Sequence, residues 1–200
     1  MLPPQLPAPL LLASTSKYRI AQLQRLGLSF EAIAPDYDEL PVLGLSAEQL
    51  VGHHAREKVR AVSQRPQFAQ AWILGADQGV ILDSELLGKP LTEDRAVAQL
   101  LRLAGRTHLL RTVVVLQAGG GPLLEQTVDI AMTLLPLTEA QAHSYVQRDQ
   151  PLDCCGSYRI EASAPWILQS ATGSDPTAIE GLPLLAVTAL LRAGLARHRA

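Results

Sequence analysis

Residues 72–82 read WILGADQGVIL, an apolar run that Gly, Asp, Gln and Gly interrupt near its centre. Trp, Ile, Leu and Val favour a β-strand, and polar residues at the centre of such a strand are unusual. A carboxylate in such a strand is costly to bury unless it meets a cation or a hydrogen-bond donor. Asp77 is therefore either a satisfied structural residue or a general base or metal ligand that a rigid sheet holds at a cleft.

Strand and helix patterns alternate on both sides of this run. Before it, the sequence predicts a strand at 9–13, a helix that Gly27 stops, a strand at 30–34, and a long helix that Ser46 caps and Pro66 ends. After it, the sequence predicts a hairpin turn at Asp83 and Ser84 into 85–89, a helix from Thr92 to Gly105, and a hairpin of 107–117 with 123–135. The remaining sequence predicts a helix from Thr138 to about Arg148, turns and short strands at 154–168, and an apolar helix after Pro183. Helices interleaved with strands and hairpins indicate an α/β protein with a mixed sheet.

Length and composition favour one ordinary globular domain. The chain has 200 residues, 48% of them hydrophobic and 18% charged, which excludes wholesale disorder and a coiled coil. Four prolines within residues 1–9 predict a loose tail, so we expect a single domain at 10–200. The formal net charge of -2 supplies no overall positive field for a nucleic acid, so we expect no nucleic-acid partner.

Cysteine use and hydropathy indicate the compartment. The two cysteines, Cys154 and Cys155, are neighbours, and adjacent residues rarely reach disulfide geometry, which favours a reducing, cytoplasmic compartment. The N-terminal apolar run lacks a basic segment before it, so we expect no signal peptide. The apolar stretch 181–191 is about half as long as a membrane helix needs, so we expect no membrane partner.

Several charged residues could work with Asp77. Asp38 and Glu39 follow a predicted strand, and either could share a divalent cation with Asp77, because Mg²⁺ takes one or two carboxylates and completes its shell with substrate phosphates. Lys89 lies in the segment LGKP, directly after the predicted hairpin. An acidic pair in a loop or an isolated lysine is, by itself, more often a solvated surface group.

A turn rich in hydroxyl groups precedes the first predicted helix. Ser14, Thr15 and Ser16 could cradle an anion at the positive end of the helix dipole, and Arg19 lies one turn further on. Ordinary N-capping produces the same pattern, so the signal is weak alone. The sequence contains no Walker loop, GxGxxG, HExxH or spaced Cys/His set, which argues against P-loop kinases, Rossmann dehydrogenases and structural zinc modules.

Eight segments together resemble the Maf family of nucleoside triphosphate pyrophosphatases. They are LASTSKYR from Leu12, DYDE from Asp36, REK from Arg56, GADQ from Gly75, LGKP from Leu87, LAGRTH from Leu103, CCGSYRIE from Cys154 and GSDPTAIEGLPL from Gly173. Their order and spacing match from about residue 10 to 191. The resemblance implies a two-lobed, ITPase-like α/β fold with a mixed central sheet, flanking helices and a cleft between the lobes. It also implies cleavage of a nucleotide between its α and β phosphates with Mg²⁺, Mn²⁺ or Co²⁺ as cofactor.

The resemblance assigns roles position by position. Asp77 matches the family's catalytic proton acceptor, Glu39 its acidic site residue, and Lys58 and Lys89 its two site lysines, while Ser14, Ser16 and Arg19 fall on the phosphate-side loop. Glu39 and Asp77 are the candidate metal ligands. Lys17, Gly79, Ser84, Cys155 and Ala162 depart from common family residues, and Gly79 could loosen the strand that holds Asp77.

Three positions resemble the family branch that hydrolyses 7-methyl-GTP, namely Tyr18, Gln78 and Glu161. Methylation at N7 makes guanine cationic, and a cation over an aromatic face gains about 0.5 to 2 kcal/mol. The carboxylate of Glu161 could accept two N–H groups of the base while facing a positive ring. The sequence does not decide between a place in the cleft and a structural role for three further residues, Tyr158, Arg159 and Asp175.

Other functions stay open at this point. A dTTP, UTP or broad-specificity pyrophosphatase would use the same chemistry. A nucleotide-sensing regulator of division, to which the resemblance also points, would bind a nucleotide without turnover. The apolar run TVVVL at 112–116 could belong to the core or to a homodimer face, which leaves the oligomeric state undecided.

Overall fold

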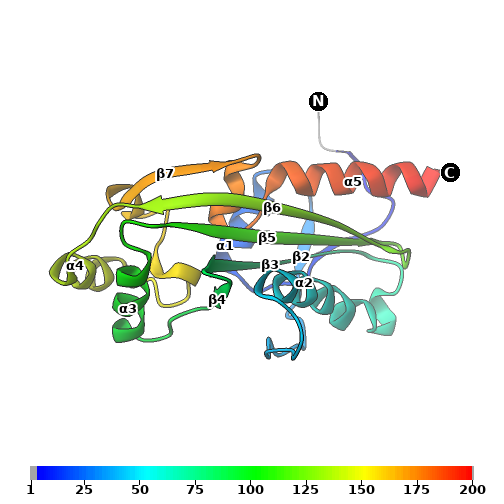
Figure 1. Cartoon of the computed structure of the whole chain (residues 1–200). Coiled ribbons are helices and arrows are strands. Elements are labelled where there is room, and N and C mark those ends of the chain that lie inside the picture. Colours follow the sequence, from blue (N-terminus) through cyan, green and yellow to red (C-terminus); the bar gives the residue numbers. More distant parts are fainter. Residues whose placement is uncertain (1–3, 200) are drawn as a thin grey trace.

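A mixed seven-stranded sheet runs through the protein in the computed structural model, which describes residues 4–199 (Figure 1). The strands are β1 (Leu10–Leu12), β2 (Phe30–Ala32), β3 (Trp72–Leu82), β4 (Glu85–Leu87), β5 (Thr107–Ala118), β6 (Leu123–Leu134) and β7 (Leu168–Gly173). Their order is β2-β1-β3-β5-β6-β7, and β4 pairs with β3. β1 runs parallel to β2 and β3, whereas β3, β5, β6 and β7 pair antiparallel. The predicted α/β class and mixed sheet are therefore confirmed.

Helices cover both faces of this sheet. They are α1 (Lys17–Gln24), α2 (Ala47–Ser63), α3 (Glu93–Leu103), α4 (Glu139–Asp149) and α5 (Leu184–Arg199), with short 3-10 turns η1 (Pro66–Phe68), η2 (Cys155–Ser157), η3 (Ala164–Trp166) and η4 (Pro176–Glu180). α2 packs on one face of β3 and β5, and α5 lies across β5 and β6 on the opposite face (Figure 1). None of these helices is long and apolar enough to cross a membrane, within residues 4–199.

The side-chain alternation of β3 decides which residues face α2. Ile73 packs in the core cluster under α2, while Leu74 and Ala76 pack in the cluster under α5. Asp77 follows the odd-numbered positions and therefore points toward α2. A Cβ at Gly75 would overlap the side chain of Val59 on α2, so glycine at this position allows the helix to lie close against the strand.

Caps and turns form largely where the sequence predicts them. Ser16, Ser46, Thr92 and Thr138 are the N-caps of α1, α2, α3 and α4. The region 154–168 was expected to contain short strands, but it forms the 3-10 turns η2 and η3 instead. β7 was not predicted as a separate strand, because its sequence LQSATG is mostly exposed at the sheet edge and lacks an apolar pattern.

The prolines predicted a loose tail at residues 1–9, but part of this segment packs against the core. Residues 1–3 of the predicted tail lie outside the described residues. Leu6 and Ala8 pack against the cluster under α5, and the carbonyl oxygen of Pro9 accepts a hydrogen bond from Trp72 N at 2.8 Å.

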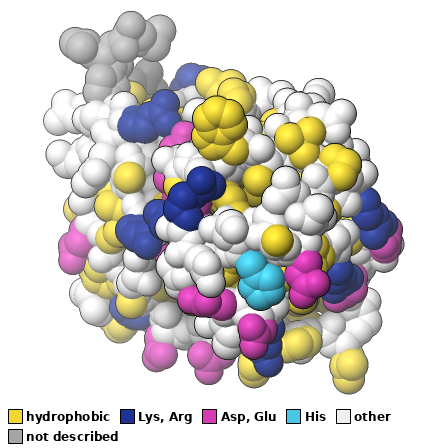
Figure 2. All heavy atoms as spheres, turned by 90° about the vertical axis from the view of Figure 1, so that its left-hand side faces the viewer, with side chains coloured by type: hydrophobic (Ala, Val, Ile, Leu, Met, Phe, Trp, Pro, Cys, Tyr) yellow, Lys and Arg dark blue, Asp and Glu magenta, His cyan; other side chains and the backbone are white. Residues whose placement is uncertain are grey.

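Surface charge is mixed on the side of the molecule that carries α3 and α4. Figure 2 shows Lys and Arg side chains lying among Asp and Glu side chains on this side, without a broad area of one sign. Arg102 with Glu85 and Arg106 with Asp83 are pairs of this kind.

Candidate functional site

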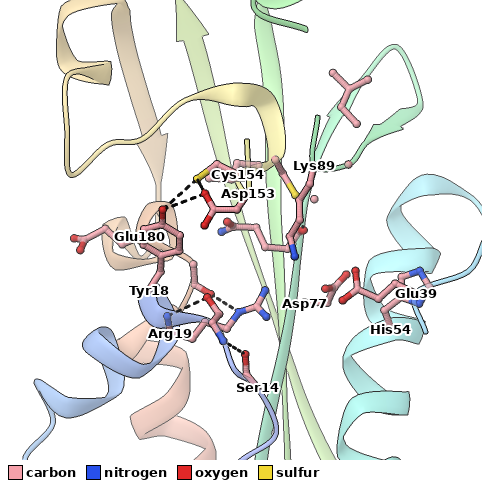
Figure 3. Close-up of a pocket in the computed structure, with 18 of the residues that line it drawn as sticks. Ser14, Tyr18, Arg19, Glu39, His54, Asp77, Lys89, Asp153, Cys154 and Glu180 are labelled. Atoms are coloured by element: carbon pink, nitrogen blue, oxygen red, sulfur yellow. Dashed lines mark hydrogen bonds between the residues drawn. The ribbon is translucent and has the colours of Figure 1, made fainter. Parts of the chain in front are cut away.

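A cavity of about 860 Å³ opens beside the centre of β3, and this volume lies within the usual range for small-molecule sites, about 300–1,000 Å³. The loop after β1, the helix α2, the strands β3 and β4, and residues of 153–161 and 179–181 line it. Figure 3 shows Tyr18, Asp153 and Cys154 gathered on one side of the cavity, and Asp77, Glu39 and His54 on the other.

Lys58 joins two carboxylates on the β3 side of the cavity. Its Nζ lies 2.5 Å from Oδ1 of Asp77 and 2.6 Å from Oε1 of Glu39. The side chains of Lys58 and Asp77 are only 6% and 8% exposed, whereas Glu39 is 45% exposed. A charge buried this deeply is tolerated because an opposite charge meets it. The structure thus brings together three of the four residues that the sequence predicts for the reaction.

Electrostatics at this cluster favour an ionised Glu39. Burial alone would raise the pKa of the Glu39 carboxyl, but the nearby cations, Lys58 foremost, together outweigh burial and bring the pKa below its usual value. Lys89 and Arg19 act on Glu39 in the same direction. Lys89, the fourth predicted residue, also lines the cavity, so three cations converge on the space beside Asp77.

Glu39 and Asp77 could also serve a divalent cation. Both carboxylate oxygens contact the same ammonium, so they lie within about 5 Å of each other. No group of three or more His, Cys, Asp or Glu side chains suitable for a metal occurs in residues 4–199. Because Mg²⁺ needs only one or two carboxylates when phosphates and waters complete its shell, the donor set fits a cation that binds together with phosphates.

The predicted phosphate-side loop lies at the N-terminus of α1. Oγ of Ser14, a buried residue, accepts a hydrogen bond from Ser16 N at 3.1 Å, and Oγ of Ser16 caps the helix by accepting from Arg19 N. Arg19 Nε donates to the carbonyl oxygen of Gly181 at 3.2 Å, which fixes the guanidinium between α1 and the end of η4. All three residues line the cavity. Capping and anion binding are thus both open to this loop.

Tyr18 stands on the opposite side, surrounded by charged groups. Its hydroxyl donates to Oδ1 of Asp153 at 3.3 Å, and Asp153 also pairs with Lys17 at 3.2 Å. Burial is the main reason why the pKa of Tyr18 lies well above its ordinary value. Burial likewise raises the pKa of the Cys154 thiol to about 12, so this thiol stays protonated and is a poor nucleophile near neutral pH.

Gln78 and Glu161 complete this side. Gln78 Nε2 donates to Thr112 Oγ1 at 2.8 Å and to the carbonyl oxygen of Ala178 at 2.6 Å. A backbone carbonyl can only accept, so this contact fixes the amide orientation and leaves Gln78 Oε1 as an acceptor for a ligand. Glu161 lines the cavity, and its Oε1 accepts from Arg159 Nε at 3.0 Å.

The three residues whose role the sequence left undecided lie in different parts of the structure. Tyr158 lines the cavity, and its hydroxyl bonds His108 Nε2 at 3.0 Å. Asp175 is structural, because its carboxylate oxygens accept from Thr177 and from the first residues of α5. Arg159 lies over the Tyr18 ring, with 5.7 Å from its guanidinium carbon to the ring centroid.

Sequence reasoning did not identify His54 or Asp153 as cavity residues. His54 lines the cavity and its Nδ1 lies 2.6 Å from the hydroxyl of Tyr37, which ties the loop carrying Glu39 to α2. Its position four residues before Lys58 places both on one helical face, a signal that the sequence contained. Asp153 gave no local signal, because Tyr18, its hydrogen-bond partner, is 135 residues away.

Similarity to known proteins agrees with this geometry. Residues 9–194 match the family of Maf-like proteins. The chain belongs to the Maf family. The protein named 7-methyl-GTP pyrophosphatase in Nitrosococcus oceani is 39% identical over 191 residues, which are 95% of each chain. The one of the same name in Aromatoleum aromaticum is 40% identical over 185 residues, or 92% of this chain and 94% of that protein.

A solved structure extends the comparison to the fold. The Ham1 protein of Staphylococcus aureus aligns with a TM-score of 0.50, covering 94% of this Maf chain and 98% of its own. The two share 14% of their residues, so the similarity concerns the fold alone. The family resemblance of the eight motifs and the fold class expected from it are both confirmed.

Proposed function

We propose that this protein is a nucleotide pyrophosphatase that hydrolyses 7-methyl-GTP to 7-methyl-GMP and diphosphate. The observation that carries the proposal is one cavity with two unlike sides. The buried pair of Asp77 and Lys58, with the half-exposed Glu39 beside it, lies on one side, and Tyr18 with Glu161 lies on the other. The relatives in N. oceani and A. aromaticum, which carry this activity in their names, align over nearly the whole chain.

Asp77 is the group that takes the proton from water. Its Oδ1 is engaged by Lys58, and Oδ2 is left to accept a hydrogen bond from a water in the cavity. The water oxygen bonds to the α phosphorus, the bond from that phosphorus to the bridging oxygen breaks, and Asp77 receives the proton. Because β3 and α2 hold Asp77 rigidly, this contribution is positioning together with general-base catalysis.

Positive side chains stabilise the charge that moves onto the leaving diphosphate. Lys89 and Arg19 lie near Glu39, and Ser14 and Ser16 line the same end of the cavity. Fixed cations at the place where charge develops need no reorganisation during the reaction. A divalent cation held by Glu39 and Asp77 would add further charge neutralisation on the phosphate oxygens.

Base recognition falls to Tyr18, Gln78 and Glu161. A cationic 7-methylguanine ring gains about 0.5 to 2 kcal/mol over an aromatic face. The carboxylate of Glu161 and Oε1 of Gln78 are both acceptors, which matches the N–H donors on the Watson–Crick edge of guanine. These contacts favour a positively charged purine over a neutral one.

A substrate panel tests the proposal. Purified protein would be incubated with 7-methyl-GTP, GTP, dTTP and UTP in Mg²⁺ or Mn²⁺, and release of diphosphate and monophosphate would be followed. We expect the highest kcat/KM with 7-methyl-GTP. A preference for dTTP or UTP would keep the chemistry and reject the base assignment. Tight nucleotide binding without diphosphate release on any substrate would reject the enzymatic assignment.

We also propose that residues 10–200 form one catalytic domain and that the protein works in the cytoplasm. The strands that line the cavity belong to one sheet, and the lining residues on α2 lie on a helix that packs on this sheet, which supports a single domain. Both cysteines are free thiols, and this supports a reducing compartment.

A further inference from the structure

We propose that Arg159 is a positioning residue for base recognition, which holds Tyr18 and Glu161 in the arrangement that selects a positively charged base. The inference rests on the proposed function and assigns a specificity role to a residue that sequence patterns left undecided.

The side chain of Arg159 contacts both recognition residues at once. Its Nε donates to Oε1 of Glu161 at 3.0 Å, and its guanidinium carbon lies 5.7 Å from the centroid of the Tyr18 ring. Its Nη1 donates to the carbonyl oxygen of Asp149 at 3.1 Å. One planar group therefore links α1, the end of α4 and the loop that carries Glu161.

The end of α4 anchors this group. Asp149 is the last residue of α4, where the helix dipole favours a cation. The backbone N–H of Arg159 donates to the hydroxyl of Tyr145 at 2.9 Å, on the same helix. The carboxylate of Asp149 accepts from both N and Oγ of Ser163, so α4 holds the loop on both sides of Glu161.

Glu161 depends on Arg159 for its orientation. It lies in a turn between η2 and η3, outside any helix or strand. Within residues 4–199, Arg159 is the group that forms a hydrogen bond or ion pair with the Glu161 carboxylate. The contact uses Oε1 and leaves Oε2 for a ligand. A carboxylate fixed before binding loses less rotamer entropy when the base arrives.

A different role would have Arg159 occupy the place of the base and compete with it for Tyr18 and Glu161. The lining of the cavity argues against competition. Tyr18 and Glu161 both line the cavity, whereas Arg159 is not among the lining residues in the described chain. Arg159 therefore supports the two residues from outside the space that a ligand would fill. The two roles predict opposite changes in KM when the guanidinium is removed.

Arg159→Met separates the two roles, because it keeps an unbranched, flexible stem and removes the guanidinium with its charge and donors. We would measure kcat and KM for 7-methyl-GTP and GTP, and the Kd of 7-methyl-GMP by calorimetry. We expect KM for 7-methyl-GTP and Kd for 7-methyl-GMP to rise on the order of tenfold, as for one charge-assisted hydrogen bond. We expect kcat to change less than about twofold and KM for GTP to rise less, so that selectivity falls.

Two further variants serve as controls. Arg159→Lys retains a cation near Tyr18 and Glu161 and should restore part of the selectivity. Arg102 lies on α3 and forms an exposed ion pair with Glu85 of β4, and neither residue lines the cavity. Arg102→Met should therefore leave kcat, KM and Kd unchanged. Urea unfolding of each variant checks that the fold is retained.

The possible results separate clearly. A lower KM in Arg159→Met would show competition and overturn the inference, as would unchanged selectivity. An equal loss of kcat/KM on both substrates, with no partial return in Arg159→Lys, would show a merely structural role. A wild-type enzyme that does not prefer 7-methyl-GTP to GTP would overturn the proposed function and this inference together, whereas failure in the variants alone overturns only the inference.

Discussion

The two sides of the cavity differ in how the fold holds them. On the reaction side, Asp77 and Lys58 come from β3 and α2, which pack directly on each other, and both side chains are less than a tenth exposed. On the recognition side, Tyr18 is the second residue of the short helix α1, and Glu161 lies in a turn with its side chain 33% exposed. Bond cleavage needs fixed geometry, which regular elements supply. Unlike Tyr18 on α1 and Gln78 on β3, Glu161 lies on a loop, where sequence can change without disturbing the sheet.

Removing the proposed general base, Asp77, should have the largest effect on the rate. Asp77→Asn keeps the size of the side chain but can no longer take a proton, so we expect kcat to fall about 10²- to 10⁴-fold for every nucleotide hydrolysed. The measurement is steady-state diphosphate release with 7-methyl-GTP and GTP. Asp83→Asn, in the exposed β3–β4 turn, is the matched control. Near wild-type turnover in Asp77→Asn would remove Asp77 from the mechanism.

Removing the cation between the carboxylates should affect stability as well as rate. Lys58→Met leaves Asp77 as a buried charge without its partner, and we expect the free energy of unfolding to fall by about 3 kcal/mol. Mg²⁺ should recover part of this loss, because the two carboxylates then lack their ammonium. Denaturant titrations with Mg²⁺ and with a chelator would measure both effects.

Arg56→Met provides the control for this comparison. Arg56 lies on the same helix and pairs with Glu125, but its side chain is about a third exposed. Loss of such a surface pair should cost less than about 1 kcal/mol. Equal losses in the two variants would contradict the buried ion pair at Lys58.

Acid should weaken the protein through a histidine behind the recognition side. His108 is buried against Tyr158, and burial lowers its pKa to about 4, compared with about 6.5 in an unfolded chain. Between these values the unfolded chain binds the proton more readily, so stability is complete above pH 6.5 and falls as the pH drops. At pH 5 the expected loss is about 1.5 kcal/mol relative to pH 6.5.

Denaturant titrations at the two pH values would test this. In His108→Gln the pH-dependent loss should shrink by about that amount, and the exposed His143→Gln should behave as wild type. If His108→Gln retained the full pH dependence of the wild type, the loss would arise elsewhere.

The sequence predicted regular elements well where periodicity was strong. The bounds of β3 agree at both ends, and β5 and β6 each differ from expectation by one residue, at the C-terminal end of the strand. β7 was missed because an exposed edge strand buries little and so carries no apolar pattern. The turns at 154–168 resisted prediction because tertiary contacts, such as Ser163 with Asp149, hold them in place.

The candidate site was predictable in its residues but not in its contacts. Asp77 stood out as a carboxylate in an apolar strand, Glu39 belonged to an acidic pair that could share a cation with it, and family motifs added Lys58. That one ammonium joins both carboxylates follows from packing of α2 on β3, which local patterns do not encode. Arg159 contacts Tyr18 from far along the chain, so no spacing rule could reveal the pair. The catalytic roles of these residues stay predictions.

The smallest expected effect tests the recognition side alone. Tyr18→Leu removes the aromatic face, and the loss of about 0.5 to 2 kcal/mol corresponds to a roughly 2- to 30-fold smaller preference for 7-methyl-GTP over GTP. Tyr18→Phe keeps the ring and removes only the hydroxyl that contacts Asp153, so most of the preference should remain. The measurement is the ratio of kcat/KM for the two substrates in each variant. If Phe lost as much selectivity as Leu, the hydrogen bond to Asp153 would be the selective element, and the ring would merely support it.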